Sequence, residues 1–179
     1  AVKVFPNALR KHGCGGDGIT WYDERFENKH FDSWPEEARA QADFLFSRDA
    51  RYGLQGGYTV IYHQLQLAFF MGIREAYLIG VDFHFSVPTT TAEDARFASH
   101  VYRKALSSGG EVNHFHPDYR KPGEKWSMPR LDLQAHAFRS AGKAFEMAGG
   151  RLVNASRSTE LAALPRSGLE VILSPQEVR

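Results

Sequence analysis

The chain has 179 residues, of which 42% are hydrophobic, so it is long enough to fold as one domain around a substantial core. Its 22 basic and 21 acidic residues give a formal charge of +1, which argues against nucleic-acid partners and against a polybasic membrane anchor. No apolar run reaches the roughly 18 residues that a membrane span needs, and the single cysteine, Cys14, excludes an intrachain disulfide. We therefore expect a cytoplasmic protein without a membrane span.

The first part of the chain has the composition of loops interrupted by short elements. Val2–Phe5 predicts the end of a strand, whereas residues 6–34 are rich in Gly, Asp and Asn and predict a loop with at most one short element. Proline followed by two glutamates suits a first helical turn and predicts a short helix from Pro35 to Ala42. Phe44–Phe46 predicts a strand.

A helix and a strand are predicted after the chain breaks at Gly53–Gly57. Tyr58–Met71 carries apolar residues three and four positions apart, which is typical of a helix with a broad buried face. Glu75–Phe85 begins with a near-continuous apolar run, as expected of a strand buried on both faces of a parallel sheet. A helix, a glycine turn and a buried strand in this order predict an α/β fold.

The second half predicts an insertion followed by another helix and strand. Residues 86–130 are polar and predict a lid region beyond the first strand, with a helix at Ala92–Leu106. Leu131–Met147 predicts a long helix, Arg151–Asn154 a short strand, and Leu161–Leu164 a helical turn. We expect a single domain over residues 1–179, with an irregular part at 1–43 and a core at 44–173.

Gln55-Gly56-Gly57-Tyr58-Thr59 is the first candidate binding segment, because it opens the predicted helix. Free backbone N–H groups at a helix start favour anions, and glycine lets a phosphate approach closely. The structural alternative is a plain glycine turn capped by Thr59. No Gly-Lys-Ser/Thr follows, so the segment is not a P-loop.

Asp82 and His84 form the second candidate, because ligands of open α/β sheets bind beyond the carboxyl ends of the strands. Both side chains lie on one face if the strand continues through Phe85. The alternative is that they cap the strand and bond to nearby loops. His63, His100 and His136 lie in predicted helices and are expected to be surface or interior residues rather than ligands.

The third candidate is the loop from Asn113 to Tyr119, with His114 and His116 two residues apart. A neutral imidazole can take a proton near pH 7, so either histidine suits a general base. With Asp82 and His84 the pair also offers metal ligands, although nothing in the sequence fixes that geometry. Lys125 and Trp126 flank the loop; simple packing is the alternative for Trp126 and Tyr119.

Several motifs in this order resemble the family described as 6-hydroxymethylpterin diphosphokinase MptE-like. They are Gly56-Gly57-Tyr58-Thr59-Val60, Leu65–Gly72 and Tyr77–Asp82, while 113–119 and 154–157 look like a subgroup tied to surface-polysaccharide synthesis. The resemblance covers residues 44–173. It implies a Rossmann-like three-layer domain with a mainly parallel sheet.

The same layout is similar, more distantly, to metal-independent bacterial sialyltransferases. That resemblance implies that Gly56, Gly57 and Thr59 lie near the donor phosphate, and that His114 or His116, with His116 preferred, is the base that deprotonates the acceptor. Tyr58, Tyr77 and Asn113 would complete the donor site, with Asp82 and His84 beside the catalytic group. Tyr119, Lys125 and Trp126 would contact the acceptor or form a lid. His84 stands where that family has a tyrosine.

Both relatives carry a Gly-rich nucleotide-binding strand and loop that residues 1–50 lack, so we expect the carboxyl-terminal part of such a domain. The leading hypothesis is a glycosyltransferase that uses a CMP-type nucleotide-sugar donor and a glycan acceptor in cell-envelope polysaccharide or lipopolysaccharide synthesis, with no metal. A second is an ATP-dependent diphosphokinase with Mg²⁺ held by Asp82 and Asp118. A third is a non-catalytic binding module that forms homo-oligomers through an exposed sheet edge.

Overall fold

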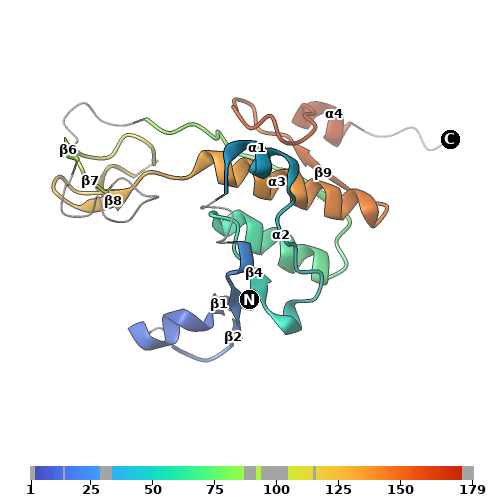
Figure 1. The fold of residues 1–179 in the computed structure, drawn as a ribbon, viewed down its shortest axis with the longest axis horizontal. Coiled ribbons are helices and arrows are strands. Elements are labelled where there is room, and N and C mark those ends of the chain that lie inside the picture. The colour runs from blue at the N-terminus through green and yellow to red at the C-terminus, as the bar shows by residue number, and fades with distance from the viewer. Residues whose placement is uncertain are drawn as a thin grey trace. The chain divides into compact units, whose positions relative to one another are not determined.

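A computed structural model of the chain describes residues 3–13, 15–28, 34–86, 92–93, 105–114 and 116–174 (Figure 1). Cys14 and His100 lie outside the described residues. The chain divides into two compact units, the first formed by Ala1–Asp82 with Leu131–Arg179 and the second by Phe83–Arg130. Within the described part of the chain, no helix combines the length and the apolar character needed to cross a membrane.

The first unit is a mixed α/β structure with short parallel strand pairs. Its strands pair as β1 with β2, β3 with β4, and β5 with β9. In chain order its elements are β1 (Lys3–Pro6), the 3₁₀ helix η1 (Asn7–His12), β2 (Ile19–Tyr22), β3 (Glu24–Arg25), α1 (Glu36–Gln41), η3 (Ala50–Tyr52), β4 (Leu54–Gln55), α2 (Val60–Phe70), β5 (Glu75–Leu78), α3 (Leu131–Met147), β9 (Arg151–Asn154) and α4 (Leu169–Leu173).

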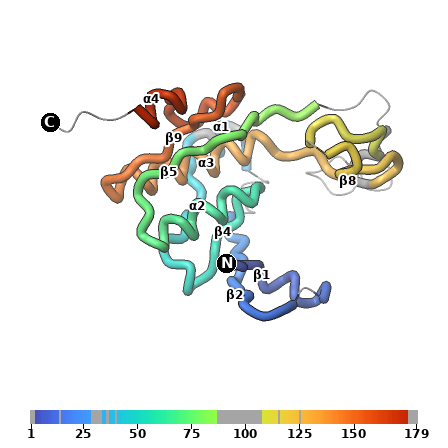
Figure 2. Tube along the Cα trace, turned by 180° about the vertical axis from the view of Figure 1, so that it is seen from behind, coloured from blue at the N-terminus to red at the C-terminus, as the bar shows by residue number. Residues whose placement is uncertain are grey.

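The core of this unit lies where α3 packs against both β9 and α2 (Figures 1 and 2). The apolar residues of α3 recur at helical spacing, so one face of the helix is buried. Phe145 of that face meets Phe69 of α2 edge-on, with ring centroids 5.3 Å apart, and Phe46 meets Phe69 at 5.4 Å. These aromatic contacts join the two helices to the segment before η3.

Buried amide side chains connect the loops of the first unit to its helices. Gln66 of α2 is fully buried; its Oε1 accepts the N–H groups of Ser47 and Gln55, and its Nε2 donates to the carbonyls of Gln55 and Tyr62. Asn28 is also buried and exchanges hydrogen bonds with both backbone groups of Leu45. These amides pair backbone groups that no strand ladder satisfies.

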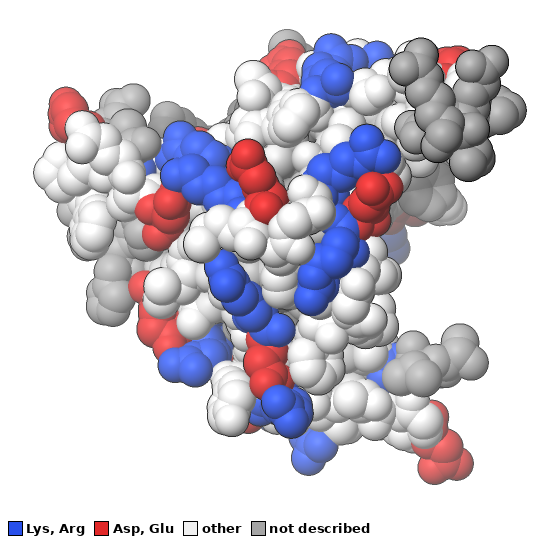
Figure 3. All heavy atoms as spheres, turned by 90° about the vertical axis from the view of Figure 1, so that its right-hand side faces the viewer, with Lys and Arg blue, Asp and Glu red and all other residues white. Residues whose placement is uncertain are grey.

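The surface of the first unit carries charges of both signs in close pairs. Lys143 contacts Asp43 at 2.8 Å, Arg151 contacts Glu75 at 3.1 Å, and Arg51 contacts Asp49 at 2.6 Å. On the face drawn in Figure 3, basic and acidic side chains are interspersed. Exposed pairs of this kind contribute roughly 0–1 kcal/mol each, so they add little to stability.

The second unit is built on a three-stranded antiparallel sheet in the order β6-β7-β8. Its elements are β6 (Ala92–Glu93), β7 (Ala105–Ser107), the 3₁₀ helix η5 (Pro117–Tyr119) and β8 (Lys125–Ser127). The unit spans the segment expected to form an insertion at 86–130. The predicted helix at Ala92–Leu106 is wrong at both described ends, because these residues pair as strands; its middle lies outside the described residues.

Several sequence predictions are confirmed, including the ends of α3 and β9. The helices α1 and α2 lie within the predicted Pro35–Ala42 and Tyr58–Met71. Residues 6–34 hold more structure than expected, because η1, β2 and β3 fall there. The Rossmann-like three-layer arrangement with one mainly parallel sheet stays a prediction, since the described strands form four small sheets.

Three further local predictions, all in the first unit or at its boundary, are wrong, because the backbone of these segments bonds or turns away from the expected element. Phe44–Phe46 is not a strand; the Phe44 N–H donates to the Ser140 hydroxyl instead of a ladder partner. Residues 161–164 are not helical, because the Leu161 backbone bonds to the side chains of Thr159 and Asn154. The strand expected at Glu75–Phe85 ends at Leu78, before positive φ angles at Gly80 (73°) and Phe83 (55°), and β5 is only half-buried.

Candidate functional site

The glycine turn before α2 has structural reasons for its residue types. A Cβ atom at Gly57 would overlap the ring of Tyr62, so the buried backbone of Gly57 requires glycine. The Thr59 hydroxyl caps α2 by accepting the Ile61 N–H, as the structural alternative predicts. Tyr58 has a φ of 61°, and its carbonyl accepts Nε2 of Gln134. A role of Gly56, Gly57, Tyr58 and Thr59 in phosphate binding stays a prediction.

Tyr77 and Asp82 lie in and after β5 of the first unit. The Tyr77 hydroxyl donates to Oε2 of Glu75 at 3.2 Å, and the Arg151 guanidinium lies 5.4 Å from the Tyr77 ring centroid. Asp82 is exposed, and its carbonyl accepts the N–H of Glu160 at 2.8 Å. The expected common strand face of Asp82 and His84 does not form, because β5 ends at Leu78.

A cavity of about 750 Å³ lies at the carboxyl ends of β5 and β9, where Leu78 and Asn154 are partners in the ladder. Asp82 lines it, together with residues that were not predicted as site residues: Ser156, Arg157 and Arg166. Parallel strands end at the same edge of their sheet, so the polar run after the predicted strand Arg151–Asn154 was the sequence signal for this site.

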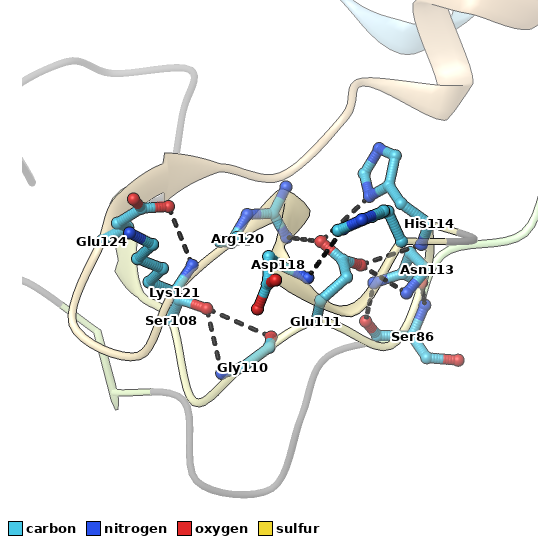
Figure 4. Close-up of polar contacts among 11 residues, drawn as sticks. Ser86, Ser108, Gly110, Glu111, Asn113, His114, Asp118, Arg120, Lys121 and Glu124 are labelled. Carbon is cyan, nitrogen blue, oxygen red and sulfur yellow. Dashed lines mark hydrogen bonds and ion pairs between the residues drawn. The ribbon is translucent and has the colours of Figure 1, made fainter.

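In the second unit, polar side chains converge on the carboxylate of Glu111 (Figure 4). The Glu111 side chain is only 1% exposed. Its Oε1 accepts the backbone N–H groups of Asn113 at 2.6 Å and His114 at 2.9 Å. Its Oε2 lies 3.0 Å from Nδ1 of His114 and 3.9 Å from Nη1 of Arg120. The sequence prediction missed Glu111, whose partners follow two and three residues later.

The hydrogen bonds to Glu111 keep its carboxylate ionised. Burial by itself would raise the pKa of Glu111, but hydrogen bonds from the Asn113 N–H and from His114 outweigh burial and lower the pKa to about 2. A negative charge therefore lies beside Nδ1 of His114 at neutral pH. The ring of His114 stacks on Tyr119, with centroids 3.7 Å apart and planes at 14°. Figure 4 shows the other imidazole nitrogen turned away from Glu111.

The other residues of the second unit that were predicted as site residues lie around the Glu111–His114 pair and make different contacts. His116 is exposed and caps η5, because its Nδ1 accepts the Asp118 N–H at 3.2 Å. The Asn113 side chain bonds to both backbone groups of Ser86, whose hydroxyl lies 3.0 Å from Nε2 of His84. The loop 113–119 and His84 are thus joined within one unit.

Trp126 forms the apolar side of the second unit, and Lys125 precedes it in β8. Its ring lies 5.3 Å from that of Phe85, and the Arg120 guanidinium stacks 4.1 Å from the Trp126 centroid. The indole N–H of Trp126 is buried and has no hydrogen-bond partner within the described part of the chain. A ligand that reached this nitrogen would find an unused donor.

The predicted metal ligands are distributed over both units. Asp82 belongs to the first unit, whereas Asp118, in η5, belongs to the second. The described residues contain no group of three or more His, Cys, Asp or Glu side chains that could hold a metal ion.

His63, which was expected to be an interior or surface residue, lies between two partners in the first unit. A 3.1 Å hydrogen bond joins its Nδ1 to the Tyr22 hydroxyl, and its Nε2 lies 3.6 Å from Oε1 of Glu24. Burial lowers the pKa of His63, although Glu24 opposes that shift. Burial, followed by the Glu24 charge, raises the pKa of Tyr22 to about 12. The cluster favours a neutral imidazole and a neutral phenol.

Comparisons of the chain with protein-family models, curated proteins and solved structures find no match. The resemblance that the motifs of residues 44–173 suggested therefore stays a prediction.

Proposed function

We propose that the protein transfers a sugar from a nucleotide-activated donor of the CMP type to a hydroxyl group of a glycan acceptor, with His114 as the base. The observation that carries this proposal is the Glu111–His114 pair. A buried carboxylate oxygen lies 3.0 Å from Nδ1 as an ion-pair contact, and Nε2 is left to take a proton. The motif resemblance supports the substrate class, cell-envelope polysaccharide or lipopolysaccharide synthesis, and a Rossmann-like first unit.

His114 is preferred over His116 because their surroundings differ. The His114 ring is held between a carboxylate and the Tyr119 ring, and its side chain keeps 31% of its surface exposed. Nδ1 of His116 already accepts the Asp118 N–H, and the residue is exposed. A base must be held within hydrogen-bonding reach of its substrate, so the fixed ring suits this role better.

Each group has a defined part in the proposed reaction. The acceptor hydroxyl gives its proton to Nε2 of His114 as its oxygen forms the new bond to the sugar carbon. The bond between that carbon and the donor phosphate breaks, and the nucleotide leaves with the electron pair. The resulting imidazolium is stabilised by the negative charge of Glu111, which makes Glu111 a positioning residue.

Transfer assays with His114→Gln and the matched variant His116→Gln test the proposal. The full chain is incubated with CMP- and UDP-sugars and an acceptor glycan. We expect His114→Gln to lower kcat by roughly 10²–10⁴-fold, as for loss of a general base, and His116→Gln to retain most activity. Glu111→Gln keeps a carbonyl oxygen for the backbone N–H groups; it should lower kcat and leave the donor KM unchanged.

Three results would contradict the proposal. Undiminished transfer by a correctly folded His114→Gln variant would remove the base from His114. Turnover of ATP–Mg²⁺ with a hydroxymethylpterin, without turnover of any nucleotide sugar, would favour the diphosphokinase alternative. A chain that self-associates and turns over neither substrate would support the non-catalytic binding module.

A further inference from the structure

The reaction proposed above does not use the cavity at the carboxyl ends of β5 and β9. Its volume of about 750 Å³ falls within the range of small-molecule and cofactor sites. It lies where two parallel strands end, which is the position of ligand sites in α/β sheets. Its lining includes Asp82, Ser156, Arg157 and Arg166.

The walls of the cavity are tied together by hydrogen bonds. The buried Ser156 hydroxyl accepts the N–H of Val81 at 2.9 Å, which joins the loop after β5 to the loop after β9. Asn154 is fully buried, and its Oδ1 accepts the Ser156 N–H at 3.1 Å. The Glu160 N–H donates to the Asp82 carbonyl at 2.8 Å. The two loops therefore hold a fixed shape before any ligand binds, which lowers the entropic cost of binding.

Arginines supply the charge that a phosphate would need. Nη2 of Arg166 donates to the carbonyls of Ser156 at 3.2 Å and Arg157 at 3.4 Å, so the Arg166 guanidinium is fixed along the cavity wall. The Arg157 side chain is exposed and has no hydrogen-bond or ion-pair partner among the residues that the structure describes. A guanidinium without a carboxylate partner is suited to bind phosphate oxygens through two parallel hydrogen bonds.

The other polar groups of the cavity fit the sugar of a nucleoside better than a second phosphate. The Asp82 carboxylate is a hydrogen-bond acceptor and not a donor, so it suits ligand groups that donate, such as the hydroxyl groups of a ribose. An acidic side chain that binds ribose hydroxyls beside a bound phosphate is a recurrent arrangement in α/β nucleotide sites. Glu170 also lines the cavity, so its charge is mixed rather than uniformly basic. This mixture favours a ligand with both hydroxyl groups and a phosphate.

We propose that this cavity binds a nucleoside 5′-phosphate, with Arg157 and Arg166 on the phosphate and Asp82 on the ribose hydroxyls. The inference rests on the proposed function only for the class of ligand, and it concerns the first unit alone. The Gly56–Thr59 turn suits a phosphate less well, because a Cβ-free Gly57 is required by packing and the Thr59 hydroxyl caps α2.

Calorimetric titration of the full chain with CMP, UMP and inorganic phosphate tests this site. We expect Arg157→Gln to weaken CMP binding by about 10-fold or more, as for a lost charge-assisted hydrogen bond. Arg48→Gln is the matched control, because Arg48 is an exposed arginine of the same unit that does not line the cavity; it should leave binding unchanged. Inorganic phosphate should compete with CMP in the wild-type protein and less in Arg157→Gln.

A second comparison isolates Asp82. The wild-type protein should prefer CMP over 2′-deoxy-CMP, and Asp82→Asn should reduce that preference. If CMP binds equally well to wild type, Arg157→Gln and Asp82→Asn, the cavity is not the nucleotide site. Loss of CMP binding in Thr59→Ala would then place the phosphate at the start of α2. That result would overturn the cavity proposal and leave the proposed transfer reaction standing. If neither nucleotides nor phosphate bind the wild-type chain, both proposals fail.

Discussion

The backbone of Gly57 lies against the ring of Tyr62 so closely that a Cβ atom there would overlap the ring carbons. Tyr62 is fully buried and cannot move aside, since its ring also meets Phe46 edge-on at 5.7 Å. A glycine that sequence reasoning assigned to phosphate binding is therefore required by the core. The neighbouring Gly56 has no such constraint, because its nearest contact would be an ordinary 3.6 Å from the Arg25 carbonyl.

This difference predicts opposite results for two alanine substitutions. Gly57→Ala should lower the free energy of unfolding by about 1–3 kcal/mol, as expected for an overpacked core. Gly56→Ala should change it little, because the added methyl group has space and reduces the entropy of the unfolded chain. Urea denaturation of both variants measures the effect. Equal destabilisation by the two substitutions would contradict the packing argument.

The amide of Gln66 predicts a second large effect on stability. Gln66→Leu keeps the approximate size of the side chain but leaves the N–H groups of Ser47 and Gln55 without their acceptor. Buried donors without partners cost roughly 1–3 kcal/mol each, so we expect a loss of at least about 2 kcal/mol. Gln64→Leu changes an exposed residue of the same helix and should stay within about 0.5 kcal/mol of wild type in the same denaturation experiment.

The elements that were predicted correctly are those that their own residues determine. The apolar spacing of Leu131–Met147 and the glycines after it identify α3 whatever it packs against. Residues 44–46 and 161–164 were predicted wrongly because distant or polar side chains, those of Ser140 and Thr159 among them, take up their backbone groups. A local sequence pattern cannot identify hydrogen-bond partners that come together only when the chain folds.

The same distinction applies to the candidate sites. The His114–Tyr119 loop was identified from the sequence because histidine side chains can act as general bases whatever the fold. Glu111 was missed, since it is one acid in a polar stretch until its carboxylate meets two backbone N–H groups. Arg166 was missed because its cavity wall forms only when the chain after β9 returns to pair Arg166 with Asn154.

The lowered pKa of His63 predicts a pH-dependent stability in the first unit. Burial favours the neutral imidazole in the folded state, whereas the unfolded chain binds a proton near its ordinary pKa of about 6.5. The stabilisation is therefore complete above that pH and is lost as the pH falls below it. The stability difference between wild type and His63→Gln should shrink from pH 8 to pH 5. His12→Gln, which removes an exposed histidine, should keep the wild-type dependence; a His63→Gln curve parallel to wild type would contradict this assignment.

The pKa of Glu111 predicts an acid transition in the second unit. Because the folded-state pKa is lowered to about 2, the stabilisation is complete above the unfolded value of about 4.3 and is lost as the pH falls from there toward 2. Trp126 can report it by fluorescence in a chain whose Trp21 and Trp34 are replaced by Phe, since its ring is buried against Phe85. In Glu111→Gln the unit should be less stable at pH 7, and its stability should vary less between pH 5 and pH 2.

Glu124→Gln provides the matched control in the same unit. Glu124 is exposed, and its Oε2 accepts the N–H of Lys121 at 2.9 Å. Its amide retains an acceptor oxygen for that bond, so the acid transition of this variant should follow that of wild type. If Glu111→Gln and Glu124→Gln give the same transition, then Glu111 does not hold the loop 111–114 together, and the orientation of His114 must have another cause.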